Sequence, residues 1–302
     1  MMKKFLKQLF IFSILPIAVF IVTSIIYADG FIDPFYLRFT TPKQENLIIG
    51  SSRAAQGIIP SILKSKLKKD FFNYSFTINH SPYGEVYYKS IEKKLDKNSK
   101  NGIYIICVDP FGITSYTSSD GTEVLNTEVI LSNMNFVNSK PNFEFILKNS
   151  ISPWREIFRK SNPKQKVELH QDGWLEVNFQ WNQAEYLKKQ KTCLEEYYNM
   201  HTKKVYSKNR VFNLKKIIEL FKKHGDVYLV RLPTSKEMYD LELKFMPNFN
   251  QIISGISHEY NVKYFDFSLD YNQYQTTDGN HLYFKSGQKL TQALCDSIAA
   301  LK

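Results

Sequence analysis

Cysteine is scarce in this sequence, and its distribution argues against several kinds of protein. The 302 residues include three cysteines, Cys107, Cys193 and Cys295, which are far apart and odd in number. A structural zinc site would need closely spaced pairs such as Cys-x-x-Cys, or cysteines grouped with histidines, and a disulfide framework would need an even, closely spaced set. We therefore expect no disulfide framework, no metal and no cofactor, and we interpret Cys107 and Cys295 as small buried hydrophobic residues.

Nucleic-acid recognition motifs are also missing. The 40 Lys+Arg against 29 Asp+Glu give a net charge of +11, which could signal an anionic partner. However, the chain has no zinc finger, RNA-binding signature or basic arm. Its lysines are scattered through helix-like stretches such as residues 60–69, as on a solvated face. No nucleic-acid partner is predicted, and no repeat of fixed period is visible.

The first 28 residues form a distinct segment. Lys3, Lys4 and Lys7 precede an uncharged, largely apolar run from Leu9 to Tyr27, which is about as long as a membrane-spanning helix. Lysines on that side predict a cytoplasmic N-terminus and an extracytoplasmic remainder, periplasmic or at the cell surface. The alternative is a cleaved signal peptide, but its apolar region is usually only about 7–15 residues long. We interpret residues 1–28 as an uncleaved single-pass anchor, followed by an irregular connector over residues 29–45.

Residues 46–302 alternate short apolar runs with longer amphipathic ones. This order predicts an α/β fold of the flavodoxin-like, three-layer αβα type, with a five-stranded parallel sheet. Gly225 is predicted to cap the helix before the fourth strand. The predicted strands are 47–49, 71–76, 103–108, 227–230 and 263–267, and the predicted helices are 60–69, 84–95, 211–224, 248–260 and 286–301.

A long insertion, about residues 112–209, follows the third predicted strand. It is too long for a bare loop in a compact domain. It includes helix-like pieces at 143–148 and 184–198 and an aromatic stretch at 170–175. Two interpretations are open, a packing subdomain or a lid over the carboxyl edge of the sheet.

The first predicted strand ends abruptly in Gly50-Ser51-Ser52-Arg53. Ligands of open α/β sheets bind outside the carboxyl ends of the strands. A serine at this turn can therefore present its hydroxyl to a substrate, but it needs a histidine base held by a third group.

A histidine with a nearby carboxylate follows the fifth predicted strand. Asp278 and His281 are three residues apart, directly before the last helix. The carboxylate can accept the imidazole Nδ1–H and leave Nε2 toward a serine. The alternative is an ordinary turn followed by a residue at a helix start.

Together, a Gly-x-Ser turn after the first strand and Asp-x-x-His before the last helix resemble the SGNH (GDSL-like) hydrolase superfamily. The resemblance covers about residues 45–301 apart from the insertion. With its N-terminal apolar segment, the sequence is similar to the membrane-anchored branch, whose members transfer acyl groups onto cell-envelope polymers. It implies that Ser52 is the nucleophile, His281 the base and Asp278 the acid partner.

The chain departs from this family in the middle. The family's glycine after the second strand and Gly-x-Asn-Asp after the third are not matched, so its oxyanion hole cannot be transferred to this sequence. Asn79 is a candidate side-chain donor, beside the backbone N–H that follows Ser52, but it could equally be a loop residue. Two roles are open for Asp109, at the end of the third strand: it enters the site, or it only shapes its turn.

Two arginines complete the candidates. Arg53 follows the nucleophile and Arg231 ends the fourth strand, so both are expected at the rim of the crevice, where a guanidinium suits a carboxylate or phosphate. The alternative for each is a salt bridge to Asp109 or to an insertion residue.

The predicted function is a serine acyl-ester hydrolase or O-acyltransferase, with an acyl donor and a hydroxyl-bearing cell-envelope glycan or lipid as partners. The alternative is a catalytically inactive binding or scaffold protein that has kept the fold. The sequence favours the enzyme because serine, histidine and aspartate all stand in matching places.

Overall fold

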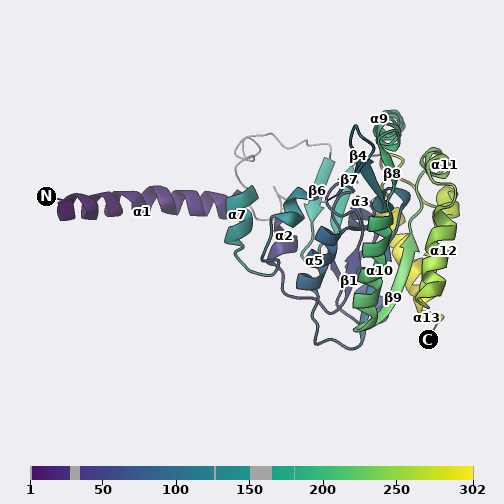
Figure 1. The fold of residues 1–302 in the computed structure, drawn as a ribbon, viewed down its shortest axis with the longest axis horizontal. Coiled ribbons are helices and arrows are strands. Elements are labelled where there is room, and N and C mark those ends of the chain that lie inside the picture. The colour runs from purple at the N-terminus through teal and green to yellow at the C-terminus, as the bar shows by residue number, and fades with distance from the viewer. Residues whose placement is uncertain (1, 28–34, 126, 150–164, 180, 302) are drawn as a thin grey trace.

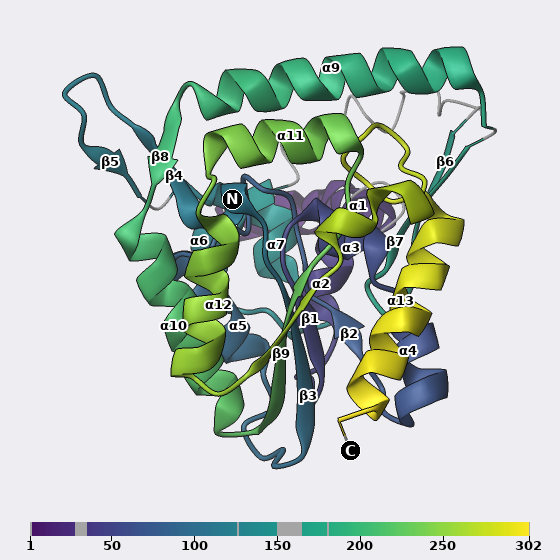
Figure 2. The same cartoon turned by 90° about the vertical axis from the view of Figure 1, so that its right-hand side faces the viewer.

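A five-stranded parallel sheet forms the centre of the protein (Figures 1 and 2). The computed structural model describes residues 2–27, 35–125, 127–149, 165–179 and 181–301. The sheet order is β10-β9-β3-β1-β2, which is the 2-1-3-4-5 order of flavodoxin-like folds. The predicted fold class is confirmed. The strands are β1 (Leu47–Ile49), β2 (Phe72–Asn73), β3 (Gly102–Cys107), β9 (Gly225–Arg231) and β10 (Lys263–Asp266).

Both faces of the sheet are buried, and the central strand shows why. Along β3, Ile103 and Ile105 point into one hydrophobic core, called here the first core, while Tyr104 and Ile106 point into the second core on the other face. Alternation over two covered faces produces the continuous apolar run seen in the sequence. The helices that cover the first core's face are α4 (Pro60–Leu67) and α13 (Phe284–Ala299), and those over the second are α5 (Glu85–Lys94), α10 (Lys208–Lys222) and α12 (Phe249–Glu259) (Figure 2).

Two local predictions need revision. Strand β2 is shorter than predicted, although its backbone pairing continues, because Tyr74 N donates to Ile48 O at 2.8 Å. Gly225 does not cap α10; it begins β9. A Cβ at Gly225 would collide with the backbone of Gly102, so this glycine serves the close approach of β9 to β3.

Helix α1 (Met2–Tyr27) projects from the domain (Figure 1). Its apolar stretch is long enough to cross a membrane, as an anchor or as a signal sequence. Of the predicted connector, residues 29–34 lie outside the described residues. Residues 36–40 are not irregular as predicted, because they form α2 (Tyr36–Thr40), which buries Tyr36 and Phe39 in the second core; residues 41–45 belong to no helix or strand.

The insertion is built from small elements. The predicted helices at 143–148 and 184–198 are present as α7 (Phe143–Asn149) and α9 (Gln183–His201), and the aromatic stretch forms the turn of a β-hairpin, β6 (Gln165–Leu169) and β7 (Leu175–Phe179). Its residues 126, 150–164 and 180 lie outside the described residues. The other elements in its described part are the short helices η1 (Pro110–Ile113), at its start, and α6 (Val129–Ser132), and the antiparallel strands β4 (Thr114–Thr117), β5 (Glu123–Val124) and β8 (Lys204–Tyr206).

Candidate active site

The turn after β1 is shaped by its glycine. Gly50 has φ of +151°, and a Cβ there would lie 2.9 Å from the backbone oxygen of Cys107. Only glycine fits where β1 passes so close to β3. The turn leads into α3 (Ser52–Gly57), with Ser51 at the N-cap and Ser52 as the first helical residue.

Ser52 forms a hydrogen-bonded chain with His281 and Asp278. Ser52 Oγ lies 2.8 Å from His281 Nε2, and His281 Nδ1 lies 2.7 Å from Asp278 Oδ2. With Asp278 ionised, Nδ1 carries the proton that it donates to the carboxylate, so Nε2 is free to accept from the serine hydroxyl. The structure therefore brings together the three residues that the sequence singled out, although Ser52 and His281 are 229 positions apart.

The loop between β10 and α13 holds the carboxylate in place. Asp278 Oδ1 accepts from the backbone N–H groups of Asn280 at 2.9 Å and His281 at 2.8 Å. Burial opposes ionisation of Asp278, but the neighbouring His281 and these hydrogen bonds outweigh it and lower the pKa to about 2. Asp278 is therefore a carboxylate at neutral pH, as an orienting partner for histidine requires.

Asn280 links this loop to two other elements. Its Oδ1 accepts from Arg53 Nε at 2.7 Å, and its Nδ2 donates to the hydroxyl of Tyr197 at 3.0 Å. Nδ2 also lies 3.3 Å from His281 Nε2. Because Tyr197 belongs to α9, the insertion is tied directly to the histidine loop.

Arg53 and Arg231 are not at the rim of the crevice, contrary to the prediction. Both are 4% exposed, and both pair with Glu242 on α11 (Lys236–Phe245), at 2.5 Å and 2.9 Å respectively. Within the described part of the chain, neither forms a salt bridge with Asp109 or with an insertion residue, as the alternative proposed. Two buried guanidiniums share one carboxylate here, which explains how they can be buried at all.

Asp109 has the turn-shaping role that the sequence left open. Its carboxylate accepts from the Ser51 hydroxyl and from Gly112 N, both at 2.9 Å, and caps η1. Asp109 thereby fixes the serine next to Ser52 rather than facing a substrate. His80 is also held locally, by Thr77 Oγ1 at 2.6 Å and against the ring of Phe35.

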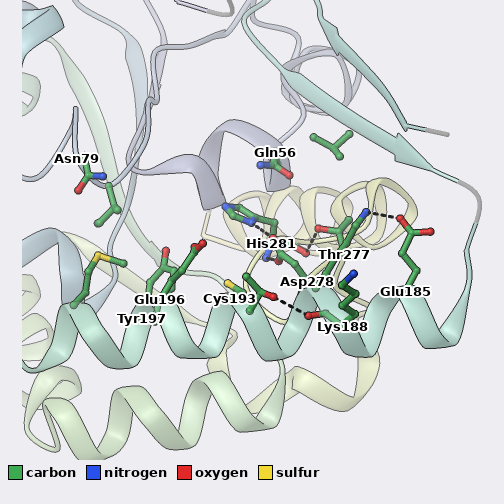
Figure 3. Close-up of a pocket in the computed structure, with 15 residues that line it drawn as sticks. Gln56, Asn79, Glu185, Lys188, Cys193, Glu196, Tyr197, Thr277, Asp278 and His281 are labelled. Carbon is green, nitrogen blue, oxygen red and sulfur yellow. Dashed lines mark hydrogen bonds and ion pairs between the residues drawn. The ribbon is translucent and has the colours of Figure 1, made fainter. Parts of the chain in front are cut away.

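A cleft of 810 Å³ lies beside His281 and Asp278 (Figure 3). The insertion provides much of its wall through one side of α9 and Val177 of β7. Cys193 also lines the cleft, but burial raises the pKa of this thiol to about 12, so it stays protonated and is a poor nucleophile. The remaining lining residues are Gln56, Ile78, Asn79, Glu185, Lys188, Lys189, Thr192, Glu196, Tyr197, Met200 and Thr277.

Asn79 is exposed and lines the same cleft; in Figure 3 it lies at one end of the labelled residues, whereas His281 lies near the middle. From this position Asn79 can contact a molecule bound in the cleft. The first amides of a helix have no intrahelical partner. The N–H groups of Ser52 and Arg53, the first two residues of α3, are donors of this kind.

Sequence reasoning missed Glu242, Asn280 and Tyr197. A signal for α11 was present, because Ser235 caps the helix and Met238 and Phe245 follow at helical spacing. That pattern would also have placed Glu242 on the inward side of the helix. No local pattern predicts the contacts of Asn280 and Tyr197, because they join segments far apart in the chain.

No protein-family model and no curated protein matches the sequence. Among solved structures, the chain is similar to Est24, a carbohydrate acetylesterase from Sinorhizobium meliloti, with a TM-score of 0.39 and 10% identity over 86% of this chain and 100% of that one. It is also similar to the inhibitor-bound aryl esterase of M. smegmatis, with a TM-score of 0.37 and 10% identity over the same shares.

Proposed function

We propose that the protein is a serine acyl-ester hydrolase or O-acyltransferase of the SGNH type, with Ser52 as nucleophile, His281 as base and Asp278 as its orienting carboxylate. The hydrogen-bonded chain from Ser52 Oγ through the imidazole to Asp278, at 2.8 Å and 2.7 Å, is the observation that carries the proposal. Serine alone is a weak nucleophile, and this arrangement is the one that activates it.

The reaction runs in two steps. Ser52 Oγ attacks the acyl carbon of the donor ester while His281 Nε2 accepts the hydroxyl proton. The intermediate then collapses, its bond to the leaving oxygen breaks, and His281 returns the proton to that oxygen. The acyl group, now on Ser52, passes to water or to an acceptor hydroxyl, which His281 deprotonates in turn; the bond between Ser52 Oγ and the acyl carbon then breaks, and His281 returns the proton to Ser52 Oγ.

Charge developing on the carbonyl oxygen needs donors near Ser52. We assign this role to the backbone N–H groups of Ser52 and Arg53, at the start of α3. Asn79, farther along the cleft, is assigned to substrate binding. The buried Arg53 side chain supports α3 through Glu242 rather than touching the substrate.

The anchor suggests where the acceptor lies. Three lysines before the apolar run of α1 support an orientation in which the domain lies outside the cytoplasm. A tethered enzyme meets polymers and lipids of the cell envelope more often than dilute solutes. We therefore propose a hydroxyl-bearing envelope glycan or lipid as acceptor.

A fluorophosphonate probe tests the nucleophile. The full-length protein in detergent should be labelled, and labelling should fall by about 10⁴-fold or more in Ser52→Ala and in His281→Ala. Ser51→Ala is the matched control, because this neighbouring serine bonds Asp109 and not the histidine. It should keep its labelling.

If the folded wild-type protein is not labelled, the activated serine is refuted and a binding or scaffold role takes its place. If Ser51→Ala loses labelling while Ser52→Ala keeps it, the nucleophile has been misassigned. For a labelled enzyme, an aryl ester supplied with and without added glycan separates hydrolysis from transfer.

A further inference from the structure

An apolar patch lies on the side of the domain where the N-terminal helix arrives. We define the patch as Phe136, Phe143 and Leu147, which are 61%, 52% and 62% exposed. Phe143 and Leu147 are one helical turn apart on α7, and Phe136 N donates to Glu144 on the same helix at 2.8 Å. The three side chains therefore belong to one local surface.

Helix α7 has two unlike faces. Phe145 and Ile146 are buried in the second core, whereas Phe143 and Leu147 point outward. Lys140 and Lys148 are exposed near its two ends, and Lys148 pairs with Glu144 at 2.8 Å. An outward face of large apolar residues flanked by lysines is typical of helices that lie in a membrane interface.

The chain's own connectivity places this face close to the membrane. The link from Tyr27, at the end of α1, to Phe35 spans eight peptide bonds and reaches at most about 29 Å when fully extended. Immediately afterwards, α2 packs on α7: Asn142 Nδ2 donates to Phe39 O at 2.9 Å, and the rings of Phe39 and Phe145 are 5.2 Å apart. Figures 1 and 2 agree that α7 and α2 are on the side of the domain from which α1 projects.

We infer that this patch rests on the lipid surface of the membrane that holds α1, as a second contact beside the anchor. The inference rests on the proposed membrane anchor but not on the proposed chemistry. Three large apolar side chains enter the interfacial region, and Lys140 and Lys148 face the phosphate groups of the lipids. The patch thereby limits how the domain can tilt on its short link.

Lipid-quenching of single labels on the full-length protein tests the contact. The three native cysteines are buried, so an environment-sensitive fluorophore can be placed at Phe143→Cys or Leu147→Cys. The protein is reconstituted in phosphatidylcholine–phosphatidylglycerol vesicles that contain nitroxide-labelled lipid. Leu243→Cys is the matched control, an exposed leucine on α11 at the far side of the domain (Figure 1). Leu15→Cys on α1 reports on the anchor itself.

The expected result is strong quenching at 15, clear quenching with a blue-shifted emission at 143 and 147, and several-fold weaker quenching at 243. Quenching at 15 with 143 and 147 no different from 243 would overturn the patch and leave the anchor standing. No quenching at 15 would overturn both. Labels at 143 and 147 that are shielded only at high protein concentration, and not by lipid, would indicate a second copy on the patch and also overturn the inference. Labelling of Ser52 by fluorophosphonate decides the chemistry separately.

Discussion

Loss of the Glu242 carboxylate should destabilise the fold strongly, although the change in side-chain shape is small. It is 1% exposed and lies between the guanidiniums of Arg53, at 2.5 Å, and Arg231, at 2.9 Å. Glu242→Gln keeps the volume but leaves two buried cations without their shared anion. Breaking a buried pair from one side costs about 3–5 kcal/mol, so we expect a lowering of Tm by roughly 6–20 °C, at about 2–4 °C per kcal/mol.

The control for this change is Asp240→Asn on the same helix. Asp240 pairs with Lys236 at 2.6 Å on the surface, where both side chains are about half exposed. Such exposed pairs contribute about 0–1 kcal/mol. Thermal unfolding followed by circular dichroism compares the two variants with the wild type. A Glu242→Gln variant as stable as Asp240→Asn would refute the view that one carboxylate makes the burial of both arginines possible.

Three further predictions follow from single contacts. Asn280→Ala should slow fluorophosphonate labelling by up to about 100-fold, because Arg53 and His281 lose a common neighbour. Asn280→Asp keeps the acceptor for Arg53 Nε and should recover part of that rate. The pKa of Asp278 is lowered from 3.8 to about 2 in the fold, so this carboxylate stabilises the protein above about pH 4, and the stabilisation is lost as pH falls toward 2. Urea unfolding at several pH values should therefore show a free energy of unfolding that falls less steeply with acid in Asp278→Asn than in the wild type. Gly173 and Gly121 have φ of +84° and +82°, so replacing either by alanine should cost about 1–2 kcal/mol of backbone strain. A Cβ at Gly173 would also meet the backbone of β2, whereas one at Gly121 would meet no described atom within 4 Å. Gly173→Ala should therefore lower Tm more than Gly121→Ala, and equal losses of Tm would contradict this interpretation of the hairpin turn.

The parallel sheet could be predicted because its strands bury both faces. A continuous apolar run such as residues 103–108 is typical of a strand covered on both sides, and the amphipathic helices between the runs leave room only for crossover connections. Gly225 shows the limit of local rules. A glycine after a helix is a good cap by its own conformation, but its use here depends on Gly102, on a strand more than 100 residues away.

The candidate site divides in the same way. Ser52, Asp278 and His281 could be predicted because each follows a strand end or precedes a helix in a recognisable order. Arg53 and Arg231 could be predicted at strand ends, but their burial could not, because it depends on Glu242 from a helix that was overlooked. A charged side chain at the end of a strand can be buried only where an oppositely charged side chain pairs with it, and otherwise it stays at the rim. Which side chain lies next to it depends on the tertiary structure and cannot be predicted from the local sequence.

The position of α9 brings the two interpretations of the insertion together. Its Cys193 and Tyr197 pack with Phe111 and Met238 in a small core of their own, as a packing subdomain would, while Lys188 and Glu196 of the same helix line the cleft. A lid that swung away would expose this core and break the hydrogen bond from Asn280 to Tyr197. The second cost falls on the loop that holds His281, so opening α9 would disturb this histidine. We therefore expect α9 to stay in place and substrates to enter along the open cleft beside it.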